Sequence, residues 1–497
     1  MPPEQVLVID AGTTGIRSLV IDRGSRAVGT AYTEFPQYHP GPDRVEQDPE
    51  EIWEATRRMI SGALEDAKAA AGDIAAVGIT NQRATTVVWD RATGDAVAPA
   101  IVWQDTRTSA LAEELRPAWG DSVYARTGWT LAPVYSSLSL RWLLDSSSDL
   151  RERAKAGALA FGTIDSWLIH RLTGGRVHAI SASNASVTGA YDLLTDDWYG
   201  EWLAELGVPV SMFPEVRDDS GDFGVTDPEV FGAEVPIAGA VADQQSALFA
   251  QHCFEPGEVK STHGTGTFLD MNVGPEPVIS TSGLSSLIAW RIKGETTYAL
   301  EGYAAVTGAV IQWLRDGAEL VQAADETEAL ARSVPDNGGV YFVPALVGLQ
   351  APYWDAGARG TICGISPSTT RQHLVRAALE GIVYSVRDFL ETMATDAGHP
   401  IATIRADGGA SRNDFLLQFQ ADALGVEVVR PANIEATALG AAYLAGLAAG
   451  VWEDREDCFA GIDPDRTFTP EMGQDERDRL YEGWKRAVGR ARGWLVV

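Results

Sequence analysis

The chain has 497 residues and a formal net charge of −30, from 39 lysines and arginines against 69 aspartates and glutamates. A single hydrophobic core stops growing at roughly 250–300 residues, so this length predicts two large lobes. The acidic charge and the lack of any basic run would repel nucleic acid and anionic membranes, so neither is an expected partner. The three cysteines lie far apart, which predicts no disulfide framework and favours the cytoplasm.

Two strand–turn–strand patterns, one in each half of the chain, indicate a duplicated architecture. In the first, VLVID (6–10) and IRSLVID (16–22) flank a turn rich in glycine and threonine. KSTHGTGTFLDMNV (260–273) repeats the pattern in the second half without repeating the residues. We therefore predict an N-terminal lobe at 1–250 and a C-terminal lobe at 251–497.

Helices and further strands are expected around these hairpins. Residues 48–69 carry apolar side chains at helical spacing, and Asp48 can cap a helix that begins at Pro49. The alanine-rich residues 298–314 are expected to form a buried helix, since Glu301 argues against a membrane span. Strands are expected at 75–82, 84–90 and 235–241.

The turn of the first hairpin is a candidate phosphate site. In DAGTTGIRS (10–18), Gly12 permits close approach of the backbone to an anion, and Thr13 and Thr14 offer hydroxyl and amide donors. Asp10, at the end of its strand, can hold Mg²⁺ directly or through water. A plain hairpin turn would give the same pattern, and the GK[ST] ending of the Walker phosphate loop is absent.

Two further glycine-rich turns follow in the second half. GTGT (264–267) is of the same type, so one hairpin in each lobe can grip a nucleotide from opposite sides. GGASRND (408–414) follows a strand that ends at Asp407 and begins a helix. It suits adenine or ribose, because glycines let a flat ring lie against the backbone. Each turn is a weak signal alone, and the ordered set of three is more specific.

These motifs carry a resemblance to the FGGY carbohydrate kinases of the sugar kinase–actin–heat-shock chaperone superfamily, and within that family the glycerol kinases are the most similar. The resemblance runs nearly end to end. The matching segments include DAGTTGIRSLVID (10–22), ITNQRATTVVW (79–89), ADQQSALF (242–249), HGTGTFLDMN (263–272), APYWDAGARGTICGI (351–365) and ADGGASRNDFLLQFQAD (406–422).

The resemblance implies a fold and an activity. The expected fold is α/β, with two RNase H-like, actin-like ATPase lobes and a catalytic cleft between them. The expected activity is phosphorylation of a small polyol by ATP with Mg²⁺, and the first expectation is conversion of glycerol to glycerol 3-phosphate. A homo-oligomer is compatible with this resemblance.

The resemblance also implies roles for single residues. Asp243 matches the catalytic base that takes the proton of the attacking hydroxyl, although the pattern alone would also suit a helix cap. Asp10 matches the acid associated with Mg²⁺, and Asp243 is a second expected metal contact. The expected substrate-binding residues are Arg83, Trp103, Tyr135, Asp243, Gln244 and Phe268. The expected nucleotide-binding residues are Thr13, Thr14, Arg17, Thr265, Gly308, Gln312, Gly409 and Asn413.

Departures from the family pattern leave the substrate open. Glycerol kinases read NQRE where this chain reads NQRA, so Ala84 replaces a carboxylate that accepts hydroxyl protons of the substrate. The pattern also has tyrosine where Val134 stands, with Tyr135 one place later. Losing one acceptor can remove on the order of 1–3 kcal/mol of recognition. A tetritol, a pentitol or a ketopentose is therefore an alternative substrate, and a non-kinase ATPase module of the same superfamily is a further alternative.

Overall fold

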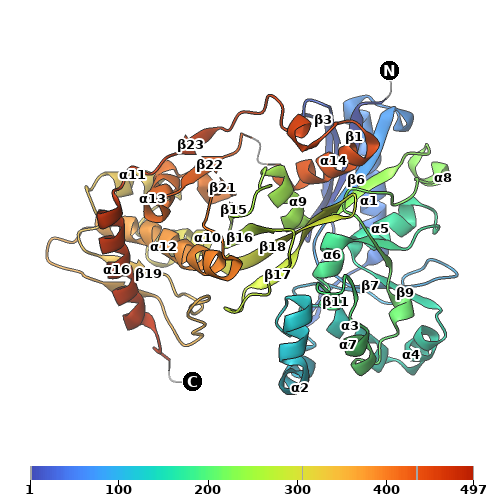
Figure 1. The fold of residues 1–497 in the computed structure, drawn as a ribbon, viewed down its shortest axis with the longest axis horizontal. Coiled ribbons are helices and arrows are strands. Elements are labelled where there is room, and N and C mark those ends of the chain that lie inside the picture. Colours follow the sequence, from blue (N-terminus) through green and yellow to red (C-terminus); the bar gives the residue numbers. More distant parts are fainter. Residues whose placement is uncertain (1–2, 305, 433–434, 496–497) are drawn as a thin grey trace.

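The computed structural model describes residues 3–304, 306–432 and 435–495, and it is an α/β structure built on two large mixed sheets (Figure 1). The first sheet has the order β14-β6-β1-β2-β3. β1 runs antiparallel to β2 and parallel to β6, and β6 runs parallel to β14. The strands are β1 (Gln5–Ala11), β2 (Gly15–Ile21), β3 (Ala27–Glu34), β6 (Ile74–Asn81) and β14 (Ile237–Ala242). The predicted first hairpin and the strand at 235–241 are confirmed.

The second sheet has the order β17-β18-β16-β15-β21-β22-β23. Around its centre, β15 runs antiparallel to β16 and parallel to β21, which repeats the arrangement of β1 with β2 and β6. The fold is therefore two RNase H-like lobes, as expected. The strands are β15 (Glu258–His263), β16 (Thr267–Gly274), β17 (Ser285–Ile292), β18 (Glu295–Ala304), β21 (Thr403–Asp407), β22 (Glu427–Arg430) and β23 (Arg466–Phe468).

The predicted helix at 48–69 is α1 (Pro49–Ala67), and its start follows from the sequence. The Asp48 side chain accepts a hydrogen bond from the Glu50 N–H at 2.8 Å, and Pro49 occupies the first turn, where its missing N–H costs nothing. The apolar face of α1, which includes Ile52, Trp53 and Ile60, packs on β2 and β3.

One helix from the end of the chain packs on the first sheet. Helix α14 (Ala436–Ala449), orange-red in Figure 1, lies beside the blue strands of the first lobe and contacts β1, β6 and β14. The sheet offers glycine at this contact: a Cβ on Gly78 would lie 2.5 Å from the Ala441 carbonyl oxygen, and a Cβ on Gly239 would lie 2.7 Å from the Ala445 nitrogen. Glycines on the strands and alanines on the helix thus permit a close approach.

The predicted helix at 298–314 is wrong for its first half. Residues 295–304 form β18, which pairs with β16 on one side and β17 on the other, and α10 (Thr307–Gln312) follows. A strand whose residues are buried on both faces of a sheet reads as a nearly continuous apolar run, so length and periodicity did not separate it from a helix. The strand expected at 84–90 begins at Val87, as β7 (Val87–Asp90), and pairs with β9 (Leu159–Gly162).

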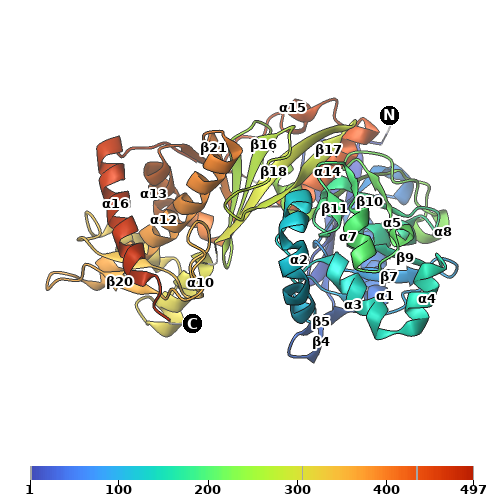
Figure 2. The same ribbon diagram turned by 60° about the horizontal axis from the view of Figure 1, so that its bottom comes forward.

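The remaining helices extend the two lobes in opposite directions. Figures 1 and 2 show α2, α3, α4 and α7 gathered in the first lobe, away from α12, α13 and α16 of the second. Among the described residues, no helix has both the length and the apolar character that a membrane span requires. These helices are α2 (Ser109–Thr127), α3 (Ser136–Ser146), α4 (Ser148–Lys155), α5 (Ile164–Leu172), α6 (Ala182–Ser186), α7 (Gly200–Glu205), α8 (Pro228–Phe231), α9 (Asp243–Ala250), α11 (Glu326–Arg332), α12 (Arg371–Ala397), α13 (Asp414–Leu424), α15 (Arg455–Cys458) and α16 (Gln474–Ala491).

Candidate active site

The predicted phosphate turn of the first lobe joins β1 to β2, and other residues bind its carbonyl groups. The Thr13 carbonyl accepts hydrogen bonds from the side-chain amides of Gln37 at 2.9 Å and Gln47 at 2.8 Å. The Thr14 carbonyl accepts one from the Phe35 N–H at 3.3 Å. Within the described residues, the N–H groups of Thr13 and Thr14 have no partner. The turn therefore presents amide donors, an arrangement that suits phosphate oxygens.

The corresponding turn of the second lobe joins β15 to β16 and is held by α10. The N–H groups of Gly308 and Ala309 donate to the carbonyls of Gly264 and Thr265, each at 3.0 Å. A Cβ on Gly308 would lie 2.7 Å from the Gly264 carbonyl oxygen, so a side chain would push the helix off the turn. Gly308 thus has a packing role at the predicted nucleotide site. Gln312, the last residue of α10, is exposed.

The third glycine-rich turn lies at the end of β21 and begins with a left-handed residue. Gly408 has φ +86°, and a Cβ there would lie 2.5 Å from the His263 carbonyl oxygen, so only glycine fits. Gly409 has open space beside it, as the predicted contact with a flat ring requires. Asn413 caps α13, accepting from the Leu416 N–H at 3.0 Å.

A cavity of about 270 Å³ lies between the third turn, α9 and α14. Gly409 and Gln244, both predicted site residues, line it from opposite halves of the chain. Lys260, Asp407 and Arg412 also line it. The Lys260 ammonium is already bound to Asp270 and Gln244, so the cavity combines backbone from the third turn with the Arg412 guanidinium, which suits an anionic ligand.

Asp10 and Arg17 form an ion pair on the first hairpin. The Arg17 guanidinium donates to Asp10 at 2.8 Å and also pairs with Glu435. Burial raises the pKa of Asp10, the Arg17 charge lowers it, and the charge of Asp243 adds to the rise. Two carboxylates close enough to repel each other make an oxygen-donor set that fits Mg²⁺. No group of three or more acids, histidines or cysteines that could hold a metal occurs in the part of the chain that the structure describes.

Asp243 begins α9, directly after β14, so the sheet and the helix together fix its place. One carboxylate oxygen accepts the Gln244 N–H at 2.7 Å and lies 3.5 Å from the Arg83 Nε. The side chain is 32% exposed, so it is accessible from the cleft. Burial raises the pKa of Asp243, and the Arg83 charge opposes the rise. A carboxylate in this environment can accept a proton from a bound hydroxyl.

Two of the predicted substrate residues, Asp243 and Tyr135, lie near Arg83. Its guanidinium makes two hydrogen bonds to Glu301, at 2.6 and 3.1 Å, and its Nε faces Asp243. Tyr135 is buried against Trp129, with ring centroids 5.3 Å apart. Burial and then the charge of Glu301 raise the pKa of the Tyr135 hydroxyl, which places that residue near the same ion pair.

Two aromatic residues predicted for the substrate pocket have defined contacts. Trp103 is 38% exposed, and its Nε1 donates to the Thr13 hydroxyl at 3.0 Å, which links the expected substrate side to the first phosphate turn. Phe268 is half-buried and lies against Tyr303, with ring centroids 4.5 Å apart. Tyr303 also covers Gly266, where a Cβ would come within 2.5 Å of its ring. Each aromatic residue therefore stands beside a phosphate turn.

Several residues beside the site are absent from the predicted set. Glu301 and Tyr303 lie on β18, and the helix predicted for this segment concealed the alternation that brings both to one face. Lys260 and Asp270 are buried charges on the second hairpin, and they are cross-strand partners. The hairpin register, counted outward from the glycine turn, pairs these two charges and is the signal that would have found them.

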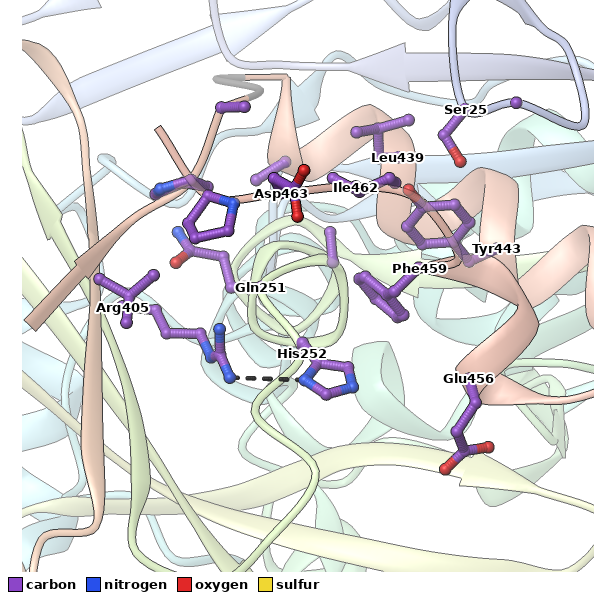
Figure 3. A pocket seen from close by; sticks show the side chains of 17 residues that line it. Ser25, Gln251, His252, Arg405, Leu439, Tyr443, Glu456, Phe459, Ile462 and Asp463 are labelled. Atoms are coloured by element: carbon purple, nitrogen blue, oxygen red, sulfur yellow. Dashed lines mark hydrogen bonds between the residues drawn. The ribbon is translucent and has the colours of Figure 1, made fainter. Parts of the chain in front are cut away.

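A larger cavity, of about 440 Å³, contains none of the predicted site residues (Figure 3). Its walls combine apolar side chains, such as Tyr443 and Phe459, with Arg405 and His252, whose ring nitrogen lies 3.4 Å from the guanidinium. Gln251 also lines it and donates to Asp407, which lines the smaller cavity. The two cavities are thus neighbours, and the predicted site residues line only the smaller of the two.

Sequence comparison shows why these features occur together. Models of the N-terminal and C-terminal domains of the FGGY family of carbohydrate kinases match residues 5–250 and 259–449. The chain belongs to the FGGY family of carbohydrate kinases. It is similar to the glycerol kinase of Carboxydothermus hydrogenoformans, with 50% identity over 498 residues and 100% of both chains covered. It is equally similar to glycerol kinase 2 of Thermotoga maritima, with 50% identity over 98% of this chain and 99% of that protein.

Solved structures of other FGGY kinases have the same fold. The crystal structure of Plasmodium falciparum glycerol kinase with ADP matches with a TM-score of 0.94 and 31% identity, over 98% of both chains. The xylulose kinase of Rhodospirillum rubrum matches with a TM-score of 0.87 and 24% identity over 98% of both chains, which bears on the fold alone. The protein is thus a two-lobed phosphotransferase, and membership of this family implies that it uses ATP.

Proposed function

We propose that the protein phosphorylates glycerol with ATP to give glycerol 3-phosphate and ADP. The observation that carries this proposal is the position of Asp243, which follows β14, lies 3.5 Å from Arg83 and is close enough to Asp10 of the first hairpin to raise the pKa of that carboxyl. End-to-end identity of 50% with proteins named glycerol kinase supports glycerol as the acceptor.

In this proposal each residue has a defined part in the transfer. Asp243 accepts the proton of the attacking hydroxyl as the bond from that oxygen to the γ-phosphorus forms. The bond from the γ-phosphorus to the bridging oxygen breaks, and ADP leaves with the electron pair. Amides of Thr13, Thr14 and Thr265 bind phosphate oxygens, and Gly409 faces the nucleoside. Asp10, with Asp243, would hold Mg²⁺, which neutralises phosphate charge when bound.

The groups around Arg83 orient the polyol. Arg83 and Gln244 would bind hydroxyl groups, while Trp103 and Phe268 would cover the carbon chain. Tyr135 is buried beside the Arg83–Glu301 pair, where a hydroxyl can supplement the polar wall of the pocket. We also propose that the chain divides into lobes at 1–250 and 251–497. Two observations support this division: every strand of the first sheet ends by Ala242, and every strand of the second sheet begins at or after Glu258.

A longer polyol or a ketopentose is the second candidate substrate, and Ala84 is the observation that favours it. Ala84 is only 6% exposed and has φ +58°, so a small side chain occupies a buried, left-handed position next to Arg83. A methyl group accepts no hydrogen bond, and it leaves room for another carbon.

A coupled assay of ADP release tests the proposal. Glycerol, erythritol, threitol, the pentitols and ketopentoses are compared at equal ATP, with a control that lacks any polyol. We expect glycerol to give the highest kcat/KM and the control to give little ADP. A higher kcat/KM for another polyol would transfer the proposal to that substrate, and equal ADP release without a polyol would indicate an ATPase module instead.

A further inference from the structure

Three charged residues lie side by side across neighbouring strands of the second sheet. Lys260 on β15 is the cross-strand partner of Asp270 on β16, and Asp270 is the partner of Glu301 on β18. Partners in a sheet project from the same face. Their side chains are almost fully buried, with Lys260 1% and Asp270 2% exposed. Buried charges are costly unless each one is paired, so the partners of this row determine what it does.

Each end of the row binds a residue that flanks Asp243. At one end, the Lys260 ammonium donates to the Gln244 side-chain oxygen at 2.6 Å as well as to Asp270 at 2.8 Å. At the other end, Glu301 accepts both hydrogen bonds from Arg83. Gln244 follows Asp243 in the chain, and the Arg83 Nε faces its carboxylate. Asp270 and Glu301 also interact through their side chains, a contact that helps to raise the pKa of Glu301. The row and these three residues therefore form a closed ring of polar contacts.

The ring joins the two halves of the chain. Arg83, Asp243 and Gln244 precede residue 250, whereas the row of three charges lies entirely beyond it. Arginine and glutamine have long side chains with many rotamers, and fixing each one costs conformational entropy during binding. Contacts that hold Arg83 and Gln244 in place beforehand remove this cost from the substrate.

We propose that Lys260, Asp270 and Glu301 are positioning residues that hold Gln244 and Arg83 in the orientation that binds the polyol. This inference rests on the proposed polyol kinase activity and adds residues to which no role has been assigned. None of the three needs to touch the substrate, because each one acts through Gln244 or Arg83. The row therefore contributes to affinity for the polyol and not to affinity for ATP.

Two variants each disrupt part of the row and avoid leaving one member of an ion pair buried without its partner. Lys260→Met with Asp270→Leu replaces the ion pair by apolar side chains, a change that often preserves stability. Glu301→Gln keeps the shape and one acceptor for Arg83 but removes the charge. A matched control is Arg126→Met with Asp192→Leu, an ion pair of 2.7 Å between α2 and β11 (Tyr191–Asp192), with no predicted site residue in it.

Steady-state kinetics of the full-length proteins test the inference, with glycerol and ATP varied separately. We expect the glycerol KM of both row variants to rise at least tenfold and their ATP KM to change less than threefold, with the control unchanged in both. A glycerol KM that rises no more than the ATP KM in both variants would overturn the positioning role. If the double variant does not fold, Glu301→Gln alone decides. Wild-type ADP release, measured first, tests the kinase proposal independently.

Discussion

Burial and the charge of Arg83 have opposite effects on the pKa of Asp243, and their combination suits a catalytic base. Burial raises its pKa, which makes the carboxylate a better proton acceptor, while Arg83 keeps the rise in check so that the group can remain ionised. Its exposed fraction of 32% leaves one side open to a ligand. A capping role alone would not require Arg83 so near, because the hydrogen bond from the Gln244 N–H already satisfies one oxygen.

Asp243→Asn tests this role directly. The amide keeps the shape and can still accept the Gln244 N–H, but it cannot take a proton. We expect kcat to fall by about 100-fold or more, since a positioned base contributes roughly 10²–10⁴ in rate. ADP binding, measured by calorimetry, and the melting temperature should stay close to those of the wild type. A kcat within threefold of the wild type would exclude Asp243 as the base.

Ala84→Glu tests whether the pocket admits a longer substrate. The added carboxylate can accept a hydroxyl proton of glycerol, and it fills the space that a fourth carbon would use. Restoring or losing about 1–3 kcal/mol of hydrogen bonding corresponds to a change of roughly 5- to 150-fold in kcat/KM. We therefore expect the ratio of kcat/KM for glycerol to that for erythritol to rise by at least tenfold. A ratio that stays within threefold would contradict an enlarged pocket next to Ala84.

Helices α12 and α16 are joined by a buried carboxylate rather than by apolar contact alone. Asp388 of α12 accepts hydrogen bonds from the Tyr481 hydroxyl and from the Trp484 Nε1, the latter at 2.9 Å, and both donors lie on α16. Burial raises the pKa of Asp388 to about 6, although these donors oppose the rise. The last helix of the chain is thus tied to the second lobe by a group whose charge changes in a mildly acidic range.

Removing the Asp388 carboxylate should lower the free energy of unfolding, and by more in an alanine variant than in an asparagine variant. Asp388→Ala leaves two buried donors without acceptors, at about 1–3 kcal/mol each. Asp388→Asn keeps one acceptor oxygen and should cost about half as much. Urea unfolding monitored by tryptophan fluorescence measures both changes. Equal stability of the alanine variant and the wild type would show that the contact contributes nothing.

The same residue predicts a pH dependence with a defined sign. Between the ordinary pKa of 3.8 and about 6, the folded state holds a proton that the unfolded state has released. The stability that Asp388 provides therefore falls as pH rises through this window and is constant above it. Because asparagine does not titrate, Asp388→Asn should destabilise the protein more at pH 4.5 than at pH 7.5. An equal or smaller effect at pH 4.5 would contradict the raised pKa.

The elements that the sequence predicted correctly have strong local signals. The helix at 48–69 has a cap and a proline, and both hairpins have glycine turns between β-branched runs. The segment 298–304 lacked such a signal, because a strand between two others is buried on both faces and loses its alternation. Glu301 was hidden for that reason, since only the strand register places it opposite Asp270.

Contacts that depend on the approach of distant segments were also beyond prediction. The sequence places α14 in the C-terminal half, and nothing local indicates that it packs on β6 and β14 of the first sheet. Gly78 and Gly239 permit that approach, but a glycine within a strand can equally mark a bulge or a tight bend. In the same way, Arg83 was predicted from its motif, while its partner Glu301 lies 218 residues away.

The two lobes are linked at several places, which limits how they can move. Helix α14 ties the end of the chain to the first sheet, and the ion pair between Arg83 and Glu301 crosses between the halves next to Asp243. Arg17 of the first hairpin also pairs with Glu435, just before α14. Motion of one lobe against the other is therefore expected to pivot near the candidate active site and to change the gap between the two phosphate turns.

Ligand-induced closure of the lobes is the prediction that tests this arrangement. In the free protein the N–H groups of Thr13 and Thr14 have no partner within the described residues, so they should exchange quickly with solvent. A phosphate that accepts hydrogen bonds from both turns should slow exchange at 10–18 and at 264–267 together. We expect this protection, and a smaller radius of gyration in solution scattering, when a non-hydrolysable ATP analogue and glycerol are both present.

Two controls separate closure from simple binding. The ATP analogue alone should protect the turns less than the pair of ligands does, because closure also requires the polyol beside Arg83 and Asp243. The hairpin of β19 (Tyr341–Val343) and β20 (Thr361–Cys363), which packs on α12 and α16 of the second lobe, should exchange at the same rate in every state. Protection confined to one half of the chain, with no change in the radius of gyration, would mean that the turns do not grip one nucleotide and would remove the shared cleft from the proposed mechanism.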